Sequence, residues 1–470
     1  MATLLAALAT FGAGFVLRPF GAIVFGRLGD THGRKSAFLA TMVLMGGATA
    51  AIGLLPTYST AGWVAPALLV LLRLIQGLAI GGEFGGAVTY VAEHSPPGRK
   101  GFYTSWLQTT GTIGLLLSLG VIMVLRTFLT EEQFAAWGWR VPFLLSLILL
   151  AFSLAIRMRL GESPAFVEMR ASGTVSRQPL RDTFGNPKVR SAVLIAIFGM
   201  VAGQAVIWYM GHFYSLQFLS ATLKLDHKLA STYLACALVL ATPFFVIFGW
   251  LSDKVGRLPL MMLGCVLSAA LFIPVFKGLE HFGNPALEAF RATHVVQLAG
   301  NDCSLTPSTQ GPTQCALARS YLTSLAVPVQ VIDSSSSLQI ISGDDVLEGF
   351  RKPELNKLLQ NQGLPMSAES TQVNGVAVVL LLMALVLMAA LVYGPLGAHL
   401  TEQFPVHVRY SAVSVSLQFG NGWIGGFGPF IATALVSSSG DVYQGLWYPI
   451  GVSVLAVVVT IFSVKPVSKY

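Results

Sequence analysis

Three ionisable residues lie within long apolar stretches of the sequence, namely Arg18, Arg73 and Glu83. A charged side chain inside a membrane-spanning helix costs from about 3 to more than 10 kcal/mol, and such residues commonly serve a function. A carboxyl group in this setting can accept and release a proton, and an arginine can pair with it or attract an anionic substrate. We therefore interpret all three as candidates for proton coupling. For Arg73, a packing role with its guanidinium bonded to backbone carbonyls is the alternative.

Two of these residues are expected at similar depths in the membrane. The helical rise places Arg18 roughly 12 Å before Gly26 and Glu83 roughly 15 Å before Glu93. We therefore expect Glu83 to be a protonation site and Arg18 to be the partner that releases it when a proton or substrate arrives. A permanent structural ion pair between closely packed helices is the alternative.

Polar and aromatic side chains also occur within the apolar stretches, at positions where leucine would suffice. These candidate substrate-binding residues are Gln108, Gln204, Trp208, Tyr209, Tyr393, Gln418 and Asn421. A hydrogen bond between neighbouring helices explains each of them singly. As a set spread over both halves of the chain, they predict a polar cavity near the middle of the membrane. His212 lies near the expected end of a helix, and a structural role is its simplest interpretation.

One short loop occurs twice, as GRLGDTHGRK at 26–35 and as GWLSDKVGRL at 249–258. Its glycines permit tight turns and close helix packing. Its aspartate can pair with the following arginine or lie at the positive N-terminal end of a neighbouring helix. A single copy is explained by topology charges alone, but two copies indicate an internal repeat. The candidate conformational gate therefore comprises Gly26, Asp30, Gly33, Arg34, Gly249, Asp253, Gly256 and Arg257.

The chain that carries these motifs is apolar, with 54% hydrophobic and only 11% charged residues. A soluble domain carries about 25% charged residues, so lipid is the solvent that this composition fits. Apolar runs of about 20 residues are long enough to cross a bilayer as helices. The fold class is therefore an all-α membrane protein. Eleven transmembrane helices are expected, at 2–25, 37–56, 63–90, 102–126, 138–157, 191–219, 229–250, 259–279, 374–399, 410–436 and 444–464.

A polar segment at 158–190 separates five expected helices from six. It is typical of a linker between two bundles, here expected at 1–157 and 191–470. Lysine and arginine concentrate in this linker and in the short loops on its side of the membrane, which identifies that side as cytoplasmic. The basic residues thus specify topology, and their distribution excludes a nucleic-acid-binding face.

The segment 280–373 holds no expected spanning helix and falls on the opposite, periplasmic side. Cys303 and Cys315 lie within it, and an oxidising compartment favours a disulfide between them. Two free cysteines in a mobile loop are the alternative. This insertion either binds a partner or ligand or is a tolerated loop expansion.

Several motifs resemble those of one transporter superfamily. The repeated loop is similar to the motif that joins the second and third helices of the major facilitator superfamily and recurs between the eighth and ninth. RLIQG at 73–77 resembles the motif of that superfamily's fourth helix, and RLGESPAF at 159–166 resembles the motif that follows the sixth. Three longer strings resemble its metabolite:proton symporter family, which includes proline/betaine, alpha-ketoglutarate, citrate and shikimate transporters. These are RLIQGLAIGGEFGGAVTYVAEHSP at 73–96, LRPFGAIVFGRLGD at 17–30 and EQFPVHVRYSAVSVSLQFGN at 402–421.

This resemblance implies two helical bundles that rock around a central site. It implies a multi-pass symporter of the bacterial inner membrane that moves a small metabolite together with protons. Intramembrane arginines favour a carboxylate or a zwitterion as the substrate. In this register the chain begins at the family's second helix, so the first is missing. We expect that Met1 is not the true start, and an incomplete copy is the alternative.

Other classes of function receive little support from the sequence. A P-loop, a metal-ligand cluster and a hydrolase signature are absent from it, so neither ATP-driven transport nor an enzyme is indicated. We expect no cofactor and no bound metal. The expected partners are the substrate, protons and the lipid bilayer, with a monomer as the simplest oligomeric state. A proton antiporter that exports drugs or metabolites and a non-transporting receptor or inactive copy remain as alternatives.

Overall fold

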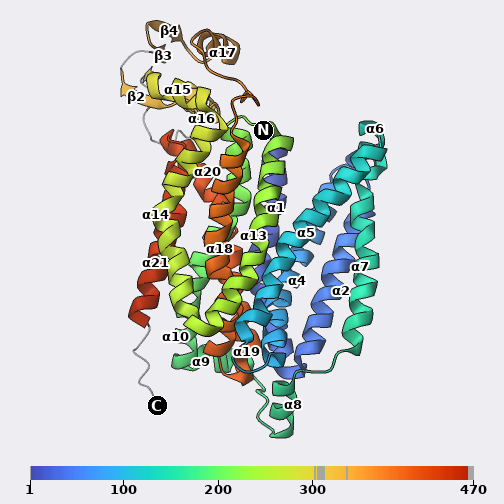
Figure 1. Ribbon diagram of the computed structural model, residues 1–470. Coiled ribbons are helices and arrows are strands. Elements are labelled where there is room, and N and C mark those ends of the chain that lie inside the picture. Colours follow the sequence, from blue (N-terminus) through green and yellow to red (C-terminus); the bar gives the residue numbers. More distant parts are fainter. Residues whose placement is uncertain (1, 301–302, 304–312, 335–336, 464–470) are drawn as a thin grey trace.

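The computed structural model describes residues 2–300, 303, 313–334 and 337–463. Long helices run side by side through most of this part of the chain (Figure 1). The first half contributes α1 (Ala2–His32), α2 (Arg34–Gly53), α4 (Val64–His94), α5 (Lys100–Phe128) and α7 (Arg140–Arg159). The second half contributes α13 (His227–Val255), α14 (Arg257–Gly283), α18 (Gly375–Gln403) and α21 (Trp447–Ser463), together with two interrupted helices.

The interrupted helices contain wide π-helical turns. One runs through α10 (Pro187–Ala196), η2 (Ile197–Val201), α11 (Ala202–Tyr209), η3 (Met210–Tyr214), α12 (Ser215–Gln217) and η4 (Phe218–Thr222). The other runs through α19 (Arg409–Gln418), η6 (Phe419–Gly425) and α20 (Gly428–Ser439). Gly199 leaves the helical conformation at φ −85°, ψ −121°. Such π-turns are frequent at functional sites.

The described residues contain nine helices that are long and apolar enough to cross a membrane. They cover nine of the expected spans. The other two, 2–25 and 410–436, coincide with α1 and with α19 to α20, which are not among the nine. The second of these is broken where glycines of η6 precede Pro429, so it forms no continuous apolar helix. The helical class of the membrane-spanning part is confirmed, whereas the number eleven is not.

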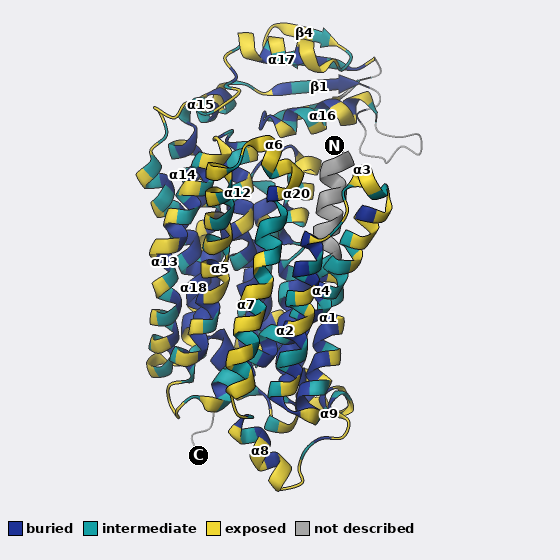
Figure 2. Ribbon diagram, turned by 90° about the vertical axis from the view of Figure 1, so that its right-hand side faces the viewer, coloured by how far each residue is buried: buried dark blue, intermediate teal, exposed yellow. Residues whose placement is uncertain are grey.

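An apolar belt surrounds the long helices. On α7, the exposed side chains include Ile148, Leu149 and Phe152, at 67%, 68% and 66% exposure. Figure 2 shows that exposed positions follow the outer helices, such as α7, and that buried positions gather behind them. Such an apolar surface is stable in lipid. The helices can face lipid because their backbone groups are hydrogen-bonded within each helix.

Short helices and turns complete the connections. The end of the helices where the segment 280–373 lies is called the insertion side. It also carries α3 (Tyr58–Ala61), α6 (Glu131–Gln133), η1 (Phe134–Gly138) and η7 (Gln444–Leu446). The opposite end, called the loop side because both repeated loops lie there, carries α8 (Pro164–Ala171), α9 (Pro179–Gly185) and η5 (Val406–Val408). Gly33 and Gly256 form the tight turns between α1 and α2 and between α13 and α14, at φ 114° and 96°. Side chains rarely adopt this backbone conformation, which accounts for a glycine at each turn.

The segment between α14 and α18 folds into a small α/β unit at one end of the helices (Figure 1). It contains α15 (Pro285–Thr293), α16 (Gln314–Ser324) and α17 (Lys352–Asn361), with strands β1 (Val296–Gly300), β2 (Val329–Asp333), β3 (Gln339–Ser342) and β4 (Asp345–Glu348). The sheet order is β2-β1-β3-β4, with β1 and β2 parallel and the other pairs antiparallel. A disulfide joins Cys303 and Cys315, whose Cα atoms are 5.1 Å apart.

This unit is seated on the second half of the chain. Asn284 Nδ2 donates to the Leu223 carbonyl at 2.9 Å, and Lys224 Nζ donates to the Ser324 carbonyl at 2.6 Å. Burial lowers the pKa of Lys224 below its usual range. Arg291 on α15 pairs with the buried Glu280 at the end of α14. These bonds hold the unit against the ends of the C-terminal helices.

We predict that Gly256→Ala lowers the thermal unfolding temperature of the purified protein. Its φ of 96° strains any side chain, at a cost of about 1–3 kcal/mol, although the added Cβ would meet nothing closer than 3.6 Å. Gly47→Ala is the matched control, because Gly47 is helical and its Cβ would have no neighbour within 4 Å. Equal unfolding temperatures for the two variants would contradict this role of Gly256.

Candidate functional site

Asp30 lies at the end of α1, where it meets the beginning of α19 from the other half of the chain. Its carboxylate accepts hydrogen bonds from the backbone N–H of Tyr410 at 3.2 Å and of Ser411 at 2.9 Å. The first N–H groups of a helix have no partner within the helix and carry its positive dipole end, so they attract an anion. Asp30 is fully buried, and this carboxylate therefore caps a helix of the opposite half.

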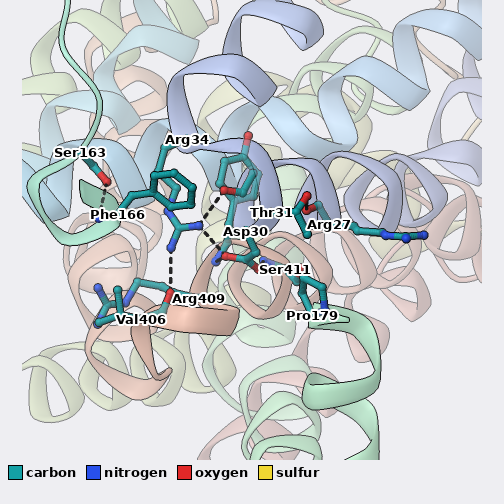
Figure 3. A network of polar contacts seen from close by, with 12 residues as sticks. Arg27, Asp30, Thr31, Arg34, Ser163, Phe166, Pro179, Val406, Arg409 and Ser411 are labelled. Atoms are coloured by element: carbon teal, nitrogen blue, oxygen red, sulfur yellow. Dashed lines mark hydrogen bonds and ion pairs between the residues drawn. The ribbon is translucent and has the colours of Figure 1, made fainter. Parts of the chain in front are cut away.

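Arg34 holds this carboxylate in place (Figure 3). Its Nη1 donates to Asp30 Oδ1 at 2.6 Å, and its Nη2 donates to the Val406 carbonyl at 2.7 Å. Glu93 at the end of α4 lies 3.6 Å from Arg34 Nε and accepts from Arg409 Nη1 at 3.0 Å. Asp30, Arg34, Glu93 and Arg409 form the first gate, a buried charge network between the two halves.

The second copy of the loop repeats this arrangement in the opposite sense. Asp253 at the end of α13 accepts from the backbone N–H of Gly101 and of Phe102 in the first turn of α5, both at 2.8 Å. Arg257 Nη1 donates to Asp253 at 2.6 Å, and its Nη2 donates to Glu402 at 3.2 Å. Asp253, Arg257 and Glu402 form the second gate, in which the C-terminal half caps a helix of the N-terminal half.

Close packing accompanies both gates. A Cβ at Gly26 would lie 2.8 Å from Ser411 Cα, and a Cβ at Gly249 would lie 2.4 Å from Ser105 Cβ. Neither position has room for a side chain. The structure thus brings six of the eight predicted gate residues to contacts between the halves on the loop side, namely Gly26, Asp30, Arg34, Gly249, Asp253 and Arg257. Gly33 and Gly256 form the adjoining turns.

A second cluster lies deeper, where Arg18 on α1 meets α11. Arg18 Nη1 donates to Tyr209 Oη at 3.2 Å, and its guanidinium carbon lies 4.0 Å from the centre of the Phe15 ring. The Arg18 Nε atom is buried without a partner. This arginine therefore bridges the two halves near the middle of the helices and retains free donors.

Aromatic rings from several helices surround this position. Tyr393 on α18 has its ring centre 6.4 Å from that of Trp208, 6.1 Å from that of Phe84 on α4 and 6.2 Å from that of Phe245 on α13. Trp208 and Tyr209 also contact each other at 5.0 Å. The structure thus brings together three predicted substrate-binding residues, Trp208, Tyr209 and Tyr393.

The predicted glutamines are buried with polar atoms that have no protein partner. Both amide atoms of Gln108 and of Gln204 are in this state, and so is Oε1 of Gln418, whose Nε2 donates to the Ile80 carbonyl at 3.0 Å. The three residues are 3%, 1% and 3% exposed. His212 bonds the Trp208 carbonyl through Nδ1, and its Nε2 is unpartnered. Asn421 lies in η6, where its carbonyl accepts from Gly426.

The expected pairing of Arg18 with Glu83 is wrong. Among the described residues no ion pair joins them, because Arg18 turns toward Tyr209. Burial dominates the surroundings of Glu83, and the positive charge that acts on it is that of Arg157 on α7, although the described residues form no ion pair there either. Similar depth placed Arg18 and Glu83 in one plane, but depth does not fix the direction in which a side chain points.

Arg73 makes a local bond in the N-terminal half. Its Nη1 donates to Gln76 Oε1 at 3.1 Å, and Gln76 Nε2 donates to Thr49 Oγ1 at 2.8 Å. This partner is a side-chain amide and not one of the backbone carbonyls of the packing alternative, so both roles of Arg73 stay predictions. The described hydrogen bonds of Arg73 thus lie apart from the aromatic cluster.

Glu93, Glu402 and Arg409 were not predicted as gate residues. The sequence does carry a signal for two of them, since Glu93 lies within YVAEHSP at 90–96 and Glu402 begins EQFPVHVRY, each beside a helix end. Arg157 was likewise not among the predicted residues. The pairing of these charges across the molecule depends on contacts between residues far apart in the chain.

We predict that Asp30→Asn loosens the loop side. The amide loses the charge that both α19 and Arg34 stabilise, at a cost of about 1.4 kcal/mol, which is tenfold in population. The readout is maleimide labelling of Ser105→Cys, a fully buried reporter beside Gly249, in a Cys236→Ser background. We expect labelling about tenfold faster.

Asp226→Asn is the matched control for this measurement. Asp226 also caps a helix, but it accepts from Lys228 and Leu229 within its own α13. Its replacement should leave the labelling rate unchanged. Equal acceleration by both variants would mean that Asp30 acts on general stability and not on the gate.

Comparisons with known proteins agree with this architecture. A family model of the Major Facilitator Superfamily matches residues 1–280. The Shikimate transporter of Escherichia coli (strain K12) is 36% identical over 278 residues, which cover 59% of this chain and 63% of that protein. The Proline/betaine transporter of Salmonella typhimurium (strain LT2) is 38% identical over 289 residues, covering 58% and 56%. The chain thus spans little more than half the length of these curated relatives.

A solved structure extends the likeness to the whole fold. The proton:xylose symporter XylE, bound to 6-bromo-6-deoxy-D-glucose, superposes with a TM-score of 0.63 at 15% identity, covering 99% of this chain and 88% of that one. At this identity the likeness concerns the fold alone. The matched family model, the fold and the duplicated gate lead to one conclusion: the chain belongs to the major facilitator superfamily.

Proposed function

We propose that this protein is a secondary active transporter that moves a small carboxylate or zwitterion across the bacterial inner membrane together with protons. The observation that carries the proposal is the pair of reciprocal gates, each capping a helix of the opposite half on the same side. Such bonds stabilise one closed end without joining the halves covalently. Breaking them lets the halves rock apart, which is the motion that alternating access requires.

In this proposal the helices of 1–157 and of 191–470 act as two bundles, and 158–190 is their cytoplasmic linker. The loop side is the cytoplasmic face, so the structure corresponds to a state closed to the cytoplasm. The unit at 280–373 then lies in the periplasm, where an oxidising environment supports the Cys303–Cys315 disulfide.

Glu83 is the proposed proton carrier. It is half-buried in the middle of α4, and among the described residues it forms no hydrogen bond. An ionised carboxyl group at this depth costs free energy in the apolar surroundings. The charge and polarity of the neighbouring groups therefore decide whether Glu83 binds or releases a proton. The next residue, Phe84, stacks on Tyr393 of the aromatic cluster. A change at Glu83 is thereby transmitted to the site where the substrate is proposed to bind.

Arg157 is the proposed partner of Glu83 in place of Arg18. Its guanidinium carbon lies 3.6 Å from the centre of the Phe38 ring, and its Nη1 is buried without a hydrogen-bond partner. This cation acts electrostatically on Glu83 within the N-terminal half. The proton site and the substrate site are then adjacent but distinct, with Arg157 serving the first and Arg18 the second.

We predict that Glu83→Gln abolishes proton-driven accumulation and preserves exchange. The amide cannot carry a proton, whereas the substrate site remains intact. Uphill uptake and counterflow of labelled shikimate, proline and glycine betaine would be measured in proteoliposomes with an inward proton gradient, with and without a protonophore. Accumulation should fall to about the equilibrium level, with counterflow within about twofold of the parent protein.

The matched control is Glu132→Gln, which alters an exposed carboxylate in α6. It should accumulate substrate like the parent. Undiminished uphill uptake by Glu83→Gln would refute the role of this residue. Accumulation by the parent protein that resists the protonophore would refute proton symport itself, and accumulation driven by an outward gradient would indicate the antiporter.

A further inference from the structure

We infer that the central site binds a carboxylate that also carries hydroxyl groups, with Arg18 holding the carboxylate and glutamine amides holding the hydroxyls. This inference rests on the proposed transport function and narrows its substrate class. It excludes a quaternary ammonium zwitterion as the preferred ligand. The argument depends on the charge of the site, on its unpartnered polar atoms and on their neighbouring depths.

The charge of the site is set by Arg18. Among the described ion pairs none includes this residue, and its one hydrogen bond goes to the neutral Tyr209 hydroxyl. A guanidinium offers five N–H donors in a planar fork that fits a carboxylate with two parallel bonds. A substrate carboxylate therefore binds more strongly than the tyrosine, whereas a cationic group beside Arg18 is repelled.

Binding at Arg18 has a consequence for the two halves. The Arg18–Tyr209 hydrogen bond joins α1 of the first half to α11 of the second. A carboxylate that takes over the Arg18 donors releases Tyr209 and removes this bond. Arg18 is thus a positioning residue for the conformational change as well as an anchor for the substrate.

The unpartnered amides describe the remainder of the ligand. Gln108 and Gln204 each present a free donor and a free acceptor, and Gln418 presents a free acceptor. A buried polar group without a partner costs about 1–3 kcal/mol, so such groups need an explanation. A hydroxyl group both donates and accepts and matches a primary amide. A quaternary ammonium group can do neither.

These groups lie at neighbouring levels of the molecule, about one helical turn apart. Gln204 precedes Trp208 by about one helical turn on the same face of α11. A Cβ at Gly397 of α18 would lie 3.0 Å from Thr104 of α5. Because these helices are antiparallel, Gln108 and Tyr393 lie about one turn further on, side by side.

Gln418 of α19 lies about one helical turn to the loop side of Arg18. It lies about one helical turn before Gly422, where a Cβ would stand 3.4 Å from Arg18 Cβ. The aromatic rings of Trp208 and Tyr393 provide apolar faces next to these amides. Polar edges and flat apolar faces together suit a ring-shaped hydroxylated acid.

The test is equilibrium binding to the purified full chain in lipid nanodiscs. Three probes separate the ligand classes: shikimate, cyclohex-1-ene carboxylate, which has the same acid group and no hydroxyls, and glycine betaine. We expect shikimate to bind at least tenfold more tightly than either of the others. Gln204→Leu should weaken shikimate about tenfold and leave the hydroxyl-free acid within twofold.

Two further variants test the anchor. Arg18→Gln should weaken both acids at least tenfold, and Tyr209→Phe should strengthen both severalfold because the carboxylate no longer displaces the tyrosine. Unfolding temperatures within a few degrees of the parent exclude misfolding as the cause. The opposite sign of these two effects is not expected from a purely structural role.

Preferential binding of glycine betaine, or equal weakening of both acids by Gln204→Leu, would overturn the inference. Weakening of the acids by Tyr209→Phe would overturn the exchange at Arg18. The proposed transport function is judged separately, by protonophore-sensitive uptake of any of the labelled substrates. A betaine carried uphill with protons would therefore refute the substrate class and leave the symporter intact.

Discussion

The structure depends on one interaction used twice, a buried aspartate that caps a helix belonging to the opposite half of the chain. Asp30 caps α19 and Asp253 caps α5, so each half holds the other through the same chemistry. A carboxylate at a helix N-terminus is stabilised by both hydrogen bonds and the helix dipole. The interaction is also directional, since a small tilt of the helix moves its N–H groups out of reach of the carboxylate. The closed end is therefore firm but releasable.

The central cluster obeys a different balance. Its amides and the Arg18 guanidinium are buried with incomplete partners, which is unfavourable in the absence of a ligand. The Arg18–Tyr209 bond offsets part of this penalty and joins the halves. The two gate aspartates accept hydrogen bonds at both carboxylate oxygens, whereas several polar groups at the centre have no partner. In the proposed transport cycle, a ligand that bonds these central groups would supply free energy for releasing the bond between Arg18 and Tyr209.

The sequence predicted the features that arise from local patterns. Apolar runs located the long helices, and the repeated glycine, aspartate and arginine spacing located both gates, because each loop brings its own Asp–Arg pair together over four residues. Single polar residues in apolar surroundings identified Gln108, Gln204 and Gln418. In each case the signal lies within one segment and follows from the cost of placing that residue in lipid.

Pairings between segments could not be predicted in the same way. Arg18 and Glu83 share a depth but face different neighbours, so the expected pair does not form and Arg18 bonds Tyr209 instead. Glu93 and Arg409 meet across 316 positions of sequence. Rotation of a helix about its axis decides all of these, and periodicity fixes it only coarsely.

The α/β unit between α14 and α18 has a mechanical consequence. Its described hydrogen bonds to the rest of the chain all go to the second half, including those of Asn284, Arg319 and Asn374. It is a compact landmark outside the helices, fixed to one half by several bonds and stapled internally by its disulfide. If the halves tilt as proposed, a probe on this unit sweeps an arc. Such a lever converts a small rotation at the membrane centre into a displacement large enough for a fluorescence ruler to follow.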